Sequence, residues 1–402
     1  MYYKLNKKFN NSKKIILAIV FLVLALVSTI HIENYVGASN NNEAENSLVS
    51  TVSDILNGID LSEMQDMVDQ IDEFNLVQTS VKEKIEKILK GEYFTDYTSL
   101  TSAILSLIFG DIRKVLPLIF TIIAVGILCN IIGNLKSENK SISDIINFVF
   151  LSVIILLVLV SFKDILKNTN STINFILKQM QIIFPILITL LNTIGSISSI
   201  SIYNPLVAVL TSIVSIVFDK FLYPLFIVIF ILTILDNLTN TIKLGKLNSF
   251  LMSTFKWSIG IVFTLFTGFL SLQGISAGKY DSISLKATKF AMKSYIPIIG
   301  SYVSDGIDFF VLGATLVKNS IGLVGVIILV VTILSPIILI IIYKLSLQLC
   351  SGILEMTGNS SISSFLASCS KILILPIVLI IGIAFMYIIT ICLIMCTANI
   401  FW

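Results

Sequence analysis

The chain has 402 residues, of which 56% are hydrophobic and 13% charged, with a formal net charge of +3. Its mean hydropathy is +0.97, whereas a soluble domain carries about twice this fraction of charged residues. This composition excludes an ordinary soluble enzyme, and lysines dispersed between apolar stretches argue against nucleic-acid binding.

Residues 1–38 have the pattern of a secretory signal peptide. Five lysines precede an apolar run from Ile15 to Ile30, and Val36-Gly37-Ala38 supplies small residues before a cleavage site. The alternative is an uncleaved anchor helix, because the apolar run is slightly long for a signal peptide. In both cases the sequence predicts that residues 39–111 are exported.

The exported region is strongly acidic. Residues 39–100 contain 13 acidic and 4 basic side chains, a net charge of −9. Apolar residues recur there at steps of three and four, as in Leu61, Met64, Val68 and Ile71, which is the period of an amphipathic helix. About sixty residues make too small a core for an independent domain. We therefore expect two or three helices that pack on each other, on the membrane portion or on a partner, as a cap or as a partner-binding module.

From residue 112 onward the chain is basic and apolar, with 18 basic and 9 acidic residues. Apolar stretches long enough, or nearly so, to span a bilayer occur at 145–162, 221–235, 257–272, 321–343 and 372–396. Barrel strands would instead be short and alternating. The sequence predicts an all-α, polytopic transmembrane helical bundle in a lipid membrane, with its first two spans within residues 112–171.

The remainder of the chain shows signs of an internal duplication. Pro185 and Pro297 are 112 residues apart, and so are Pro224 and Pro336. With three further residues inserted, the segment Ser249-Phe250-Leu251 matches Ser364-Phe365-Leu366. Self-similarity at fixed spacing marks repeats, so we predict one membrane repeat at 172–286 and a second at 287–402. The spacing does not decide between parallel and inverted repeats.

Prolines and aspartates are the candidate transport-path or gating residues. Matching proline-broken helices often flank a substrate path, which makes Pro185, Pro224, Pro297 and Pro336 candidates; the alternative is that they only bend packed helices. Asp305 and Asp308 share a helix face by their spacing and could bind a cation or relay protons, or could lie at a solvated helix end. Two further features are a predicted interfacial break at Asp219-Lys220 and a predicted surface helix on an anionic leaflet around Lys279–Lys293.

The sequence predicts no catalytic, cofactor-binding or metal site. It contains no phosphate-binding loop, zinc-protease motif or nucleophile elbow. Its one histidine, His31, lies before the predicted cleavage site, and its five cysteines all lie in the apolar portion, where packing is their expected role. We therefore expect a protein that is not an enzyme.

Several local motifs follow one another in a particular order along the chain. They are the acidic exported region, Arg113-Lys114-Val115-Leu116-Pro117, Phe184-Pro185-Ile186-Leu187, Phe218-Asp219-Lys220, Tyr295-Ile296-Pro297-Ile298-Ile299-Gly300 and Ser304-Asp305-Gly306. This order resembles the stage III sporulation protein AE family of endospore-forming bacteria. The resemblance implies a multi-pass protein of the mother-cell membrane that faces the forespore. It further implies a channel assembly with ring-forming subunits and a secretion-type ATPase as partners, and no catalytic residues.

Three functions are consistent with these features. The first is a membrane subunit of a sporulation-specific channel or secretion assembly, in which the proline-containing helices line or gate a path. The second is a stand-alone secondary transporter or permease that uses intramembrane aspartates. The third is a structural membrane scaffold.

Overall fold

The computed structural model describes residues 42–71, 80–89, 97–135, 140–238, 243–295 and 299–397. The predicted signal peptide lies outside these ranges. The chain divides into two compact units, residues 1–49 and 50–402, and the account below concerns the second. Every regular element in the described part of the chain is helical, so the all-α prediction is confirmed.

Three short helices form the acidic region: α2 (Asn42–Asn57), α3 (Ser62–Ile71) and α4 (Val81–Leu89). The Gln65 side chain of α3 accepts a 2.7 Å hydrogen bond from the Val81 amide of α4. The apolar stripe predicted from the sequence is buried, and includes Leu56, Met64, Met67, Val68, Ile85 and Ile88. Because α3 and α4 contact α6 and α10, these helices pack on the membrane portion of their own chain and leave an acidic face exposed.

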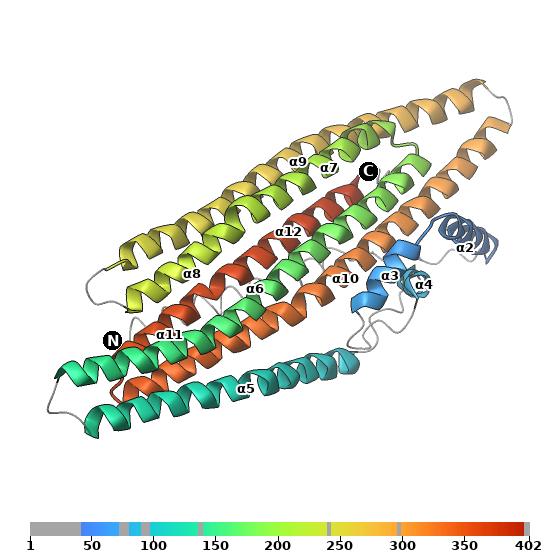
Figure 1. Cartoon of the computed structure of the whole chain (residues 1–402). Coiled ribbons are helices and arrows are strands. Elements are labelled where there is room, and N and C mark those ends of the chain that lie inside the picture. The colour runs from blue at the N-terminus through green and yellow to red at the C-terminus, as the bar shows by residue number, and fades with distance from the viewer. Residues whose placement is uncertain are drawn as a thin grey trace, which may run out of the picture. The chain divides into compact units, whose positions relative to one another are not determined.

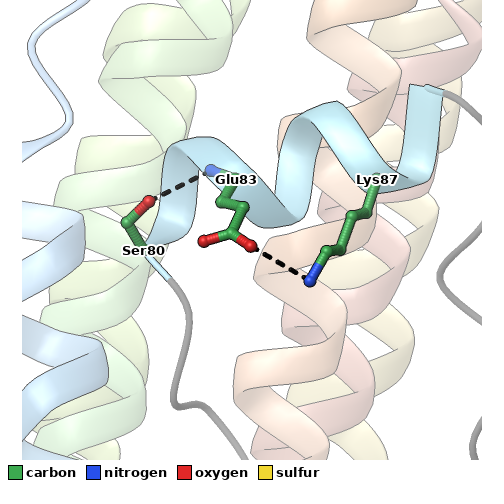
Figure 2. A network of polar contacts seen from close by, with 3 residues as sticks. All are labelled: Ser80, Glu83 and Lys87. Carbon is green, nitrogen blue, oxygen red and sulfur yellow. Dashed lines mark hydrogen bonds and ion pairs between the residues drawn. The ribbon is translucent and has the colours of Figure 1, made fainter.

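Helix α4 also illustrates how the exposed side of this region is stabilised. Ser80 precedes the helix and accepts a 3.2 Å hydrogen bond from the amide of Glu83, a helix cap, and Lys87 pairs with Glu83 at 3.1 Å (Figure 2). Such a pair, one helical turn apart, adds a few tenths of a kcal/mol at most, about 0.3. Burial of the apolar stripe is therefore the larger contribution.

Long helices form the rest of the chain and lie side by side (Figure 1). They are α5 (Tyr97–Leu135), α6 (Lys140–Thr193), α7 (Ile197–Val217), the π-helix η1 (Phe218–Leu222), α8 (Tyr223–Leu238), α9 (Gly245–Tyr295), α10 (Ile299–Met356), α11 (Ser360–Ile372) and α12 (Ile374–Cys396). Six stretches in the described residues are long and apolar enough to cross a membrane, namely 105–133, 145–193, 207–238, 245–270, 306–356 and 360–396. The chain is a multi-pass membrane protein.

Several helices are much longer than a single span requires. Helix α6 has 54 residues, α9 has 51 and α10 has 58, so α10 is about 87 Å long at 1.5 Å per residue. A hydrocarbon core is about 30 Å thick. The predicted domain boundaries at residues 111, 171 and 286 each fall inside one of the helices, and the predicted repeat units therefore share continuous helices at their ends.

Close contacts define the directions of the central helices. Gly325 of α10 touches Ile183 of α6 and the Tyr387 hydroxyl of α12; a Cβ built on this glycine would lie 3.2 Å from either side chain. Further along α10, Thr332 bonds Gln179 of α6, so α6 and α10 run antiparallel. Ile259 of α9 packs on Gly382 and Phe263 on Phe385, so α9 and α12 run parallel.

Two glycines end long helices in the same way. Gly195 (φ 83°) follows α6 and Gly358 (φ 88°) follows α10. In each turn the next residue donates its amide to a carbonyl five residues back, Ser196 to Leu191 and Asn359 to Leu354. This helix cap requires a left-handed residue, which is why glycine is used at both turns.

Candidate functional site

Pro336 lies buried within α10, and the helix continues through it. Proline has no amide hydrogen, so the carbonyl of Thr332, four residues earlier, loses its usual donor. Gln179 of α6 is fully buried and donates its side-chain amide to the Thr332 hydroxyl at 2.8 Å. Among the described residues, the Gln179 side-chain oxygen has no hydrogen-bond partner. A polar contact, only partly satisfied, therefore lies beside this proline.

Pro185 does not break α6, contrary to the expected proline-broken helix. The helix runs on to Thr193, and Pro185 itself is exposed. Its neighbour Phe184 is buried and stacks on Tyr387 of α12, with ring centroids 5.5 Å apart. Pro185 follows Gln179 by six residues, about 9 Å along the helix. The two prolines of α6 and α10 thus lie at different levels of the bundle.

Pro224 follows a π-helical turn rather than a break in the chain. The Tyr223 amide donates to the Phe218 carbonyl, five residues back, and closes the turn η1. A π-turn inserts one extra residue into a helix and is often found at functional sites. Asp219 and Lys220 lie in this turn and are exposed. The break expected at Asp219-Lys220 is therefore wrong in form, because α7, η1 and α8 are continuous.

The remaining predicted residues lie near the start of α10. Pro297 is outside the described residues, between α9 and α10. Asp305 and Asp308 both lie on α10, as their spacing requires, and Asp308 is exposed. A cation or proton role for these two carboxylates stays a prediction.

A buried polar cluster that the sequence reasoning missed joins α7, α10 and α12. Lys318 of α10 is 0% exposed and donates its ammonium group to the carbonyl of Thr397, just after α12. The Thr397 hydroxyl lies 3.1 Å from the Tyr203 hydroxyl of α7. A cation at a helix C-terminus neutralises the partial negative charge of the last carbonyls. Lys318 therefore caps α12 from a neighbouring helix.

The same face of α7 is held by a buried carboxylate of α9. Asp281 is 2% exposed and accepts hydrogen bonds from the amides of Ser198 (2.9 Å) and Ser199 (3.0 Å), and from the Ser199 hydroxyl. The negative charge lies at the N-terminus of α7, where the helix dipole favours it. Ser199 precedes Tyr203 by one helical turn. We call Lys318, Thr397, Tyr203, Asp281 and Ser199 the polar junction.

The position of Asp281 also corrects an expectation. The stretch around Lys279–Lys293 was predicted to be a separate helix on the membrane surface, but it belongs to α9, which is continuous from Gly245 to Tyr295. A signal for the polar junction was present in the sequence: Lys318 is a lone cation in an apolar run. A charge in such a run needs a buried partner or water, which marks it as a candidate.

The cavities inside the described bundle are small. The two best-formed have volumes of about 10 and 20 Å³ and are lined by apolar residues such as Phe218, Leu222 and Leu379. A cavity of this size holds about one water molecule. Within the part of the chain that the structure describes, the helices thus pack closely where these cavities lie.

Comparison with known proteins agrees with the family resemblance. The family model described as stage III sporulation protein AE matches residues 79–398. The stage III sporulation protein AE of Bacillus subtilis (strain 168) is 25% identical over 298 residues, which are 74% of this chain and 75% of that protein. No solved structure matches the chain. With most of its length covered by the family model, the chain belongs to the stage III sporulation protein AE family.

Proposed function

We propose that this protein is a non-catalytic membrane subunit of a sporulation-specific channel or secretion assembly. It lies in the mother-cell membrane facing the forespore and lines or gates a transport path together with other subunits, which include a secretion-type ATPase. Family membership supports the stage of sporulation. The observation that carries the assembly role is the length of the apolar surface.

The apolar surface is longer than one bilayer can cover. Helix α6 exposes Ile145, Leu156 and Val160, all above 60%, and α9 exposes Trp257 and Leu265 at 71% and 68%. These groups lie on helices of more than 50 residues, about 75 Å or more, whereas a hydrocarbon core is about 30 Å thick. Apolar side chains left outside the bilayer need a protein cover, which a neighbouring subunit supplies.

The small cavities favour a shared path over a stand-alone transporter. A transporter that acts alone needs a substrate site within its own bundle, and the cavities lined by Phe218 and Leu379 each hold about one water molecule. The exposed acids of the short helices, including Asp54, Glu63, Asp66 and Asp69, supply a further surface for partners. Because the apolar stripe of these helices is buried in the chain itself, a partner that binds here is expected to be basic.

Site-specific photo-crosslinking in sporulating cells tests the proposal. A photoreactive residue at Leu156 or Asp66 should crosslink to a defined protein partner, and the same residue at Leu265 should crosslink to lipid. Leu156 and Leu265 are matched controls, since both are leucines with 63% and 68% exposure. Lipid adducts alone at Leu156, with no protein adduct at Asp66, would contradict an assembly subunit and favour the stand-alone transporter.

A further inference from the structure

Basic side chains from successive long helices lie near one level of the bundle. All are exposed except Lys344, which is half-buried. They are Arg113 and Lys114 of α5, Lys163, Lys167 and Lys178 of α6, Lys220 of η1, Lys256 of α9, Lys344 of α10 and Lys371 of α11. We call these nine residues the charge belt. Three acids, Asp111, Asp164 and Asp219, lie among them, so the net charge of this level is +6.

Contacts between neighbouring helices establish the common level. The Ser370 hydroxyl, beside Lys371, donates to the Lys344 carbonyl at 3.0 Å. Phe162, beside Lys163, stacks on Phe230 with centroids 3.6 Å apart. One cavity is lined by residues of α6, η1, α8, α9 and α12, each within a few positions of the belt: Leu166, Thr169, Phe218, Tyr223, Phe255 and Pro376.

Such a concentration of charge cannot lie in hydrocarbon, because a charged side chain at the centre of a bilayer costs several kcal/mol, about 3 or more. The belt must therefore contact headgroups or water. The opposite end of the same helices carries the polar junction. Lys344 is 26 residues from Lys318, and Lys256 is 25 residues from Asp281. These separations correspond to about 38 Å of helix, which matches a hydrocarbon core of about 30 Å with part of both headgroup layers.

The other direction does not fit a bilayer equally well. From Lys344 to the end of α10 at Met356 is only 12 residues, about 18 Å. From Lys256 back to the start of α9 at Gly245 is 11 residues. Lengths of this kind are too short for a span of about 20 residues. The hydrocarbon core therefore lies between the charge belt and the polar junction.

A tryptophan gives independent support for a membrane surface at this level. Trp257 follows Lys256 directly and is 71% exposed on α9. Tryptophan is enriched where a membrane helix passes from hydrocarbon to headgroups. Basic residues at the same depth attract anionic lipids, with about 1 kcal/mol per residue near the surface.

We infer that the charge belt lies in the headgroup layer of one leaflet and binds anionic phospholipids. The polar junction then lies at the opposite surface of the same bilayer. This inference concerns the chain alone and does not depend on the proposed assembly.

Fluorescence quenching measures the depth of the belt. The chain has two tryptophans, so Trp402→Phe leaves Trp257 as the one reporter in the full-length protein. The purified variant is reconstituted into vesicles with equal amounts of phosphatidylcholine and phosphatidylglycerol that carry a nitroxide either near the headgroup or near the acyl-chain terminus. We expect stronger quenching by the shallow nitroxide. Stronger quenching by the deep nitroxide, or none by either, would overturn the inference.

A matched pair of variants tests the lipid preference. Lys220→Gln with Lys256→Gln removes two charges from the belt, and Lys243→Gln with Lys246→Gln removes two equally exposed charges at the start of α9. With the nitroxide carried by either lipid in turn, we expect the belt pair to lower the preference for phosphatidylglycerol at least about fivefold and the control pair to leave it unchanged. An equal effect of both pairs, or no effect of the belt pair, would contradict specific headgroup binding.

Discussion

The long helices and the acidic region each use an aspartate to bind a serine, and they differ in the surroundings of that aspartate. Asp281 is buried between α9 and α7 and accepts hydrogen bonds from two amides and the Ser199 hydroxyl. Asp60 is exposed before α3 and accepts hydrogen bonds from the Ser62 amide (2.9 Å) and hydroxyl (2.6 Å). The chemistry is the same, but water can replace the bonds of Asp60 and cannot replace those of Asp281. The free energy of a polar contact therefore depends on whether its groups become unsatisfied when it is lost.

The Gln179–Thr332 contact adds a third case to this comparison. It is as deeply buried as Asp281, with Gln179 fully buried. Only one end of the Gln179 amide is bonded among the described residues. A buried polar group that is half satisfied contributes little net stability. It is therefore a better candidate for a functional contact than for a structural one.

The largest effect is expected for Asp281→Ala. The substitution leaves the amides of Ser198 and Ser199 and one hydroxyl without an acceptor, and buried donors without partners cost 1–3 kcal/mol each at most, or about 3 kcal/mol together. Thermal unfolding of the purified protein in detergent measures the loss as a lower Tm. Asp281→Asn keeps one acceptor oxygen, and we expect about half the effect.

Asp164→Ala is the matched control, because Asp164 is an exposed aspartate on α6. Surface substitutions of this kind change stability by no more than about 0.5 kcal/mol. Equal Tm shifts for Asp281→Ala and Asp164→Ala would contradict the structural role of the polar junction.

The sequence was sufficient to predict the class of fold, because hydropathy over some twenty residues identifies membrane helices without knowledge of their partners. It was also sufficient to predict the buried face of α3, since Met64 and Val68 follow the helical period. It could not predict that α6 continues through its polar centre around Asn168 and through Pro185. Continuity there depends on tertiary contacts, which override local preference.

The polar junction was missed for a related reason. Asp281 and Ser199 are 82 residues apart, and Lys318 and Thr397 are 79 residues apart. No local pattern links such residues, so one sequence shows only that each is a polar residue in or beside an apolar stretch. Of the candidate residues, Pro336 lies beside a buried polar contact with Gln179, whereas Pro185 and Pro224 are exposed.

A smaller effect, of opposite sign, is expected for Gln179→Leu. Leucine has a similar volume and removes an unpaired buried oxygen, while the Thr332 hydroxyl still donates to the Ile328 carbonyl at 2.8 Å. Stability should stay the same or rise by about 1 kcal/mol. Thr332→Val is the complementary change: it leaves the whole Gln179 amide without a partner and should lower stability by about 1–2 kcal/mol.

Tm measurements on both variants separate these outcomes. Strong destabilisation by Gln179→Leu would show that the contact is structural, like Asp281. Spore yield then tests function independently of stability. A stable Gln179→Leu protein that forms no spores would assign the contact to the transport path.

The smallest effect is expected at Asp60, and it should depend on pH. The hydroxyl and amide of Ser62 donate to the carboxylate and hold the pKa of Asp60 below its usual range. A carboxyl group with a lowered folded-state pKa stabilises the fold above its unfolded-state pKa of about 3.9. This stability is lost as the pH falls through the lowered pKa. The start of α3 should therefore loosen at acidic pH, whereas Asp281→Ala loosens α7 at every pH.

Hydrogen–deuterium exchange of the full-length protein, read from peptides that begin near residue 60, measures this loosening after correction for the intrinsic exchange rate. The parent protein should lose protection at the start of α3 between about pH 5 and pH 3. Asp60→Asn keeps an acceptor that does not titrate in this range, so its corrected protection should not change with pH. Equal pH dependence of the two proteins would show that Asp60 does not control this helix start, and the comparison with Asp281 would then rest on burial without a shared chemistry.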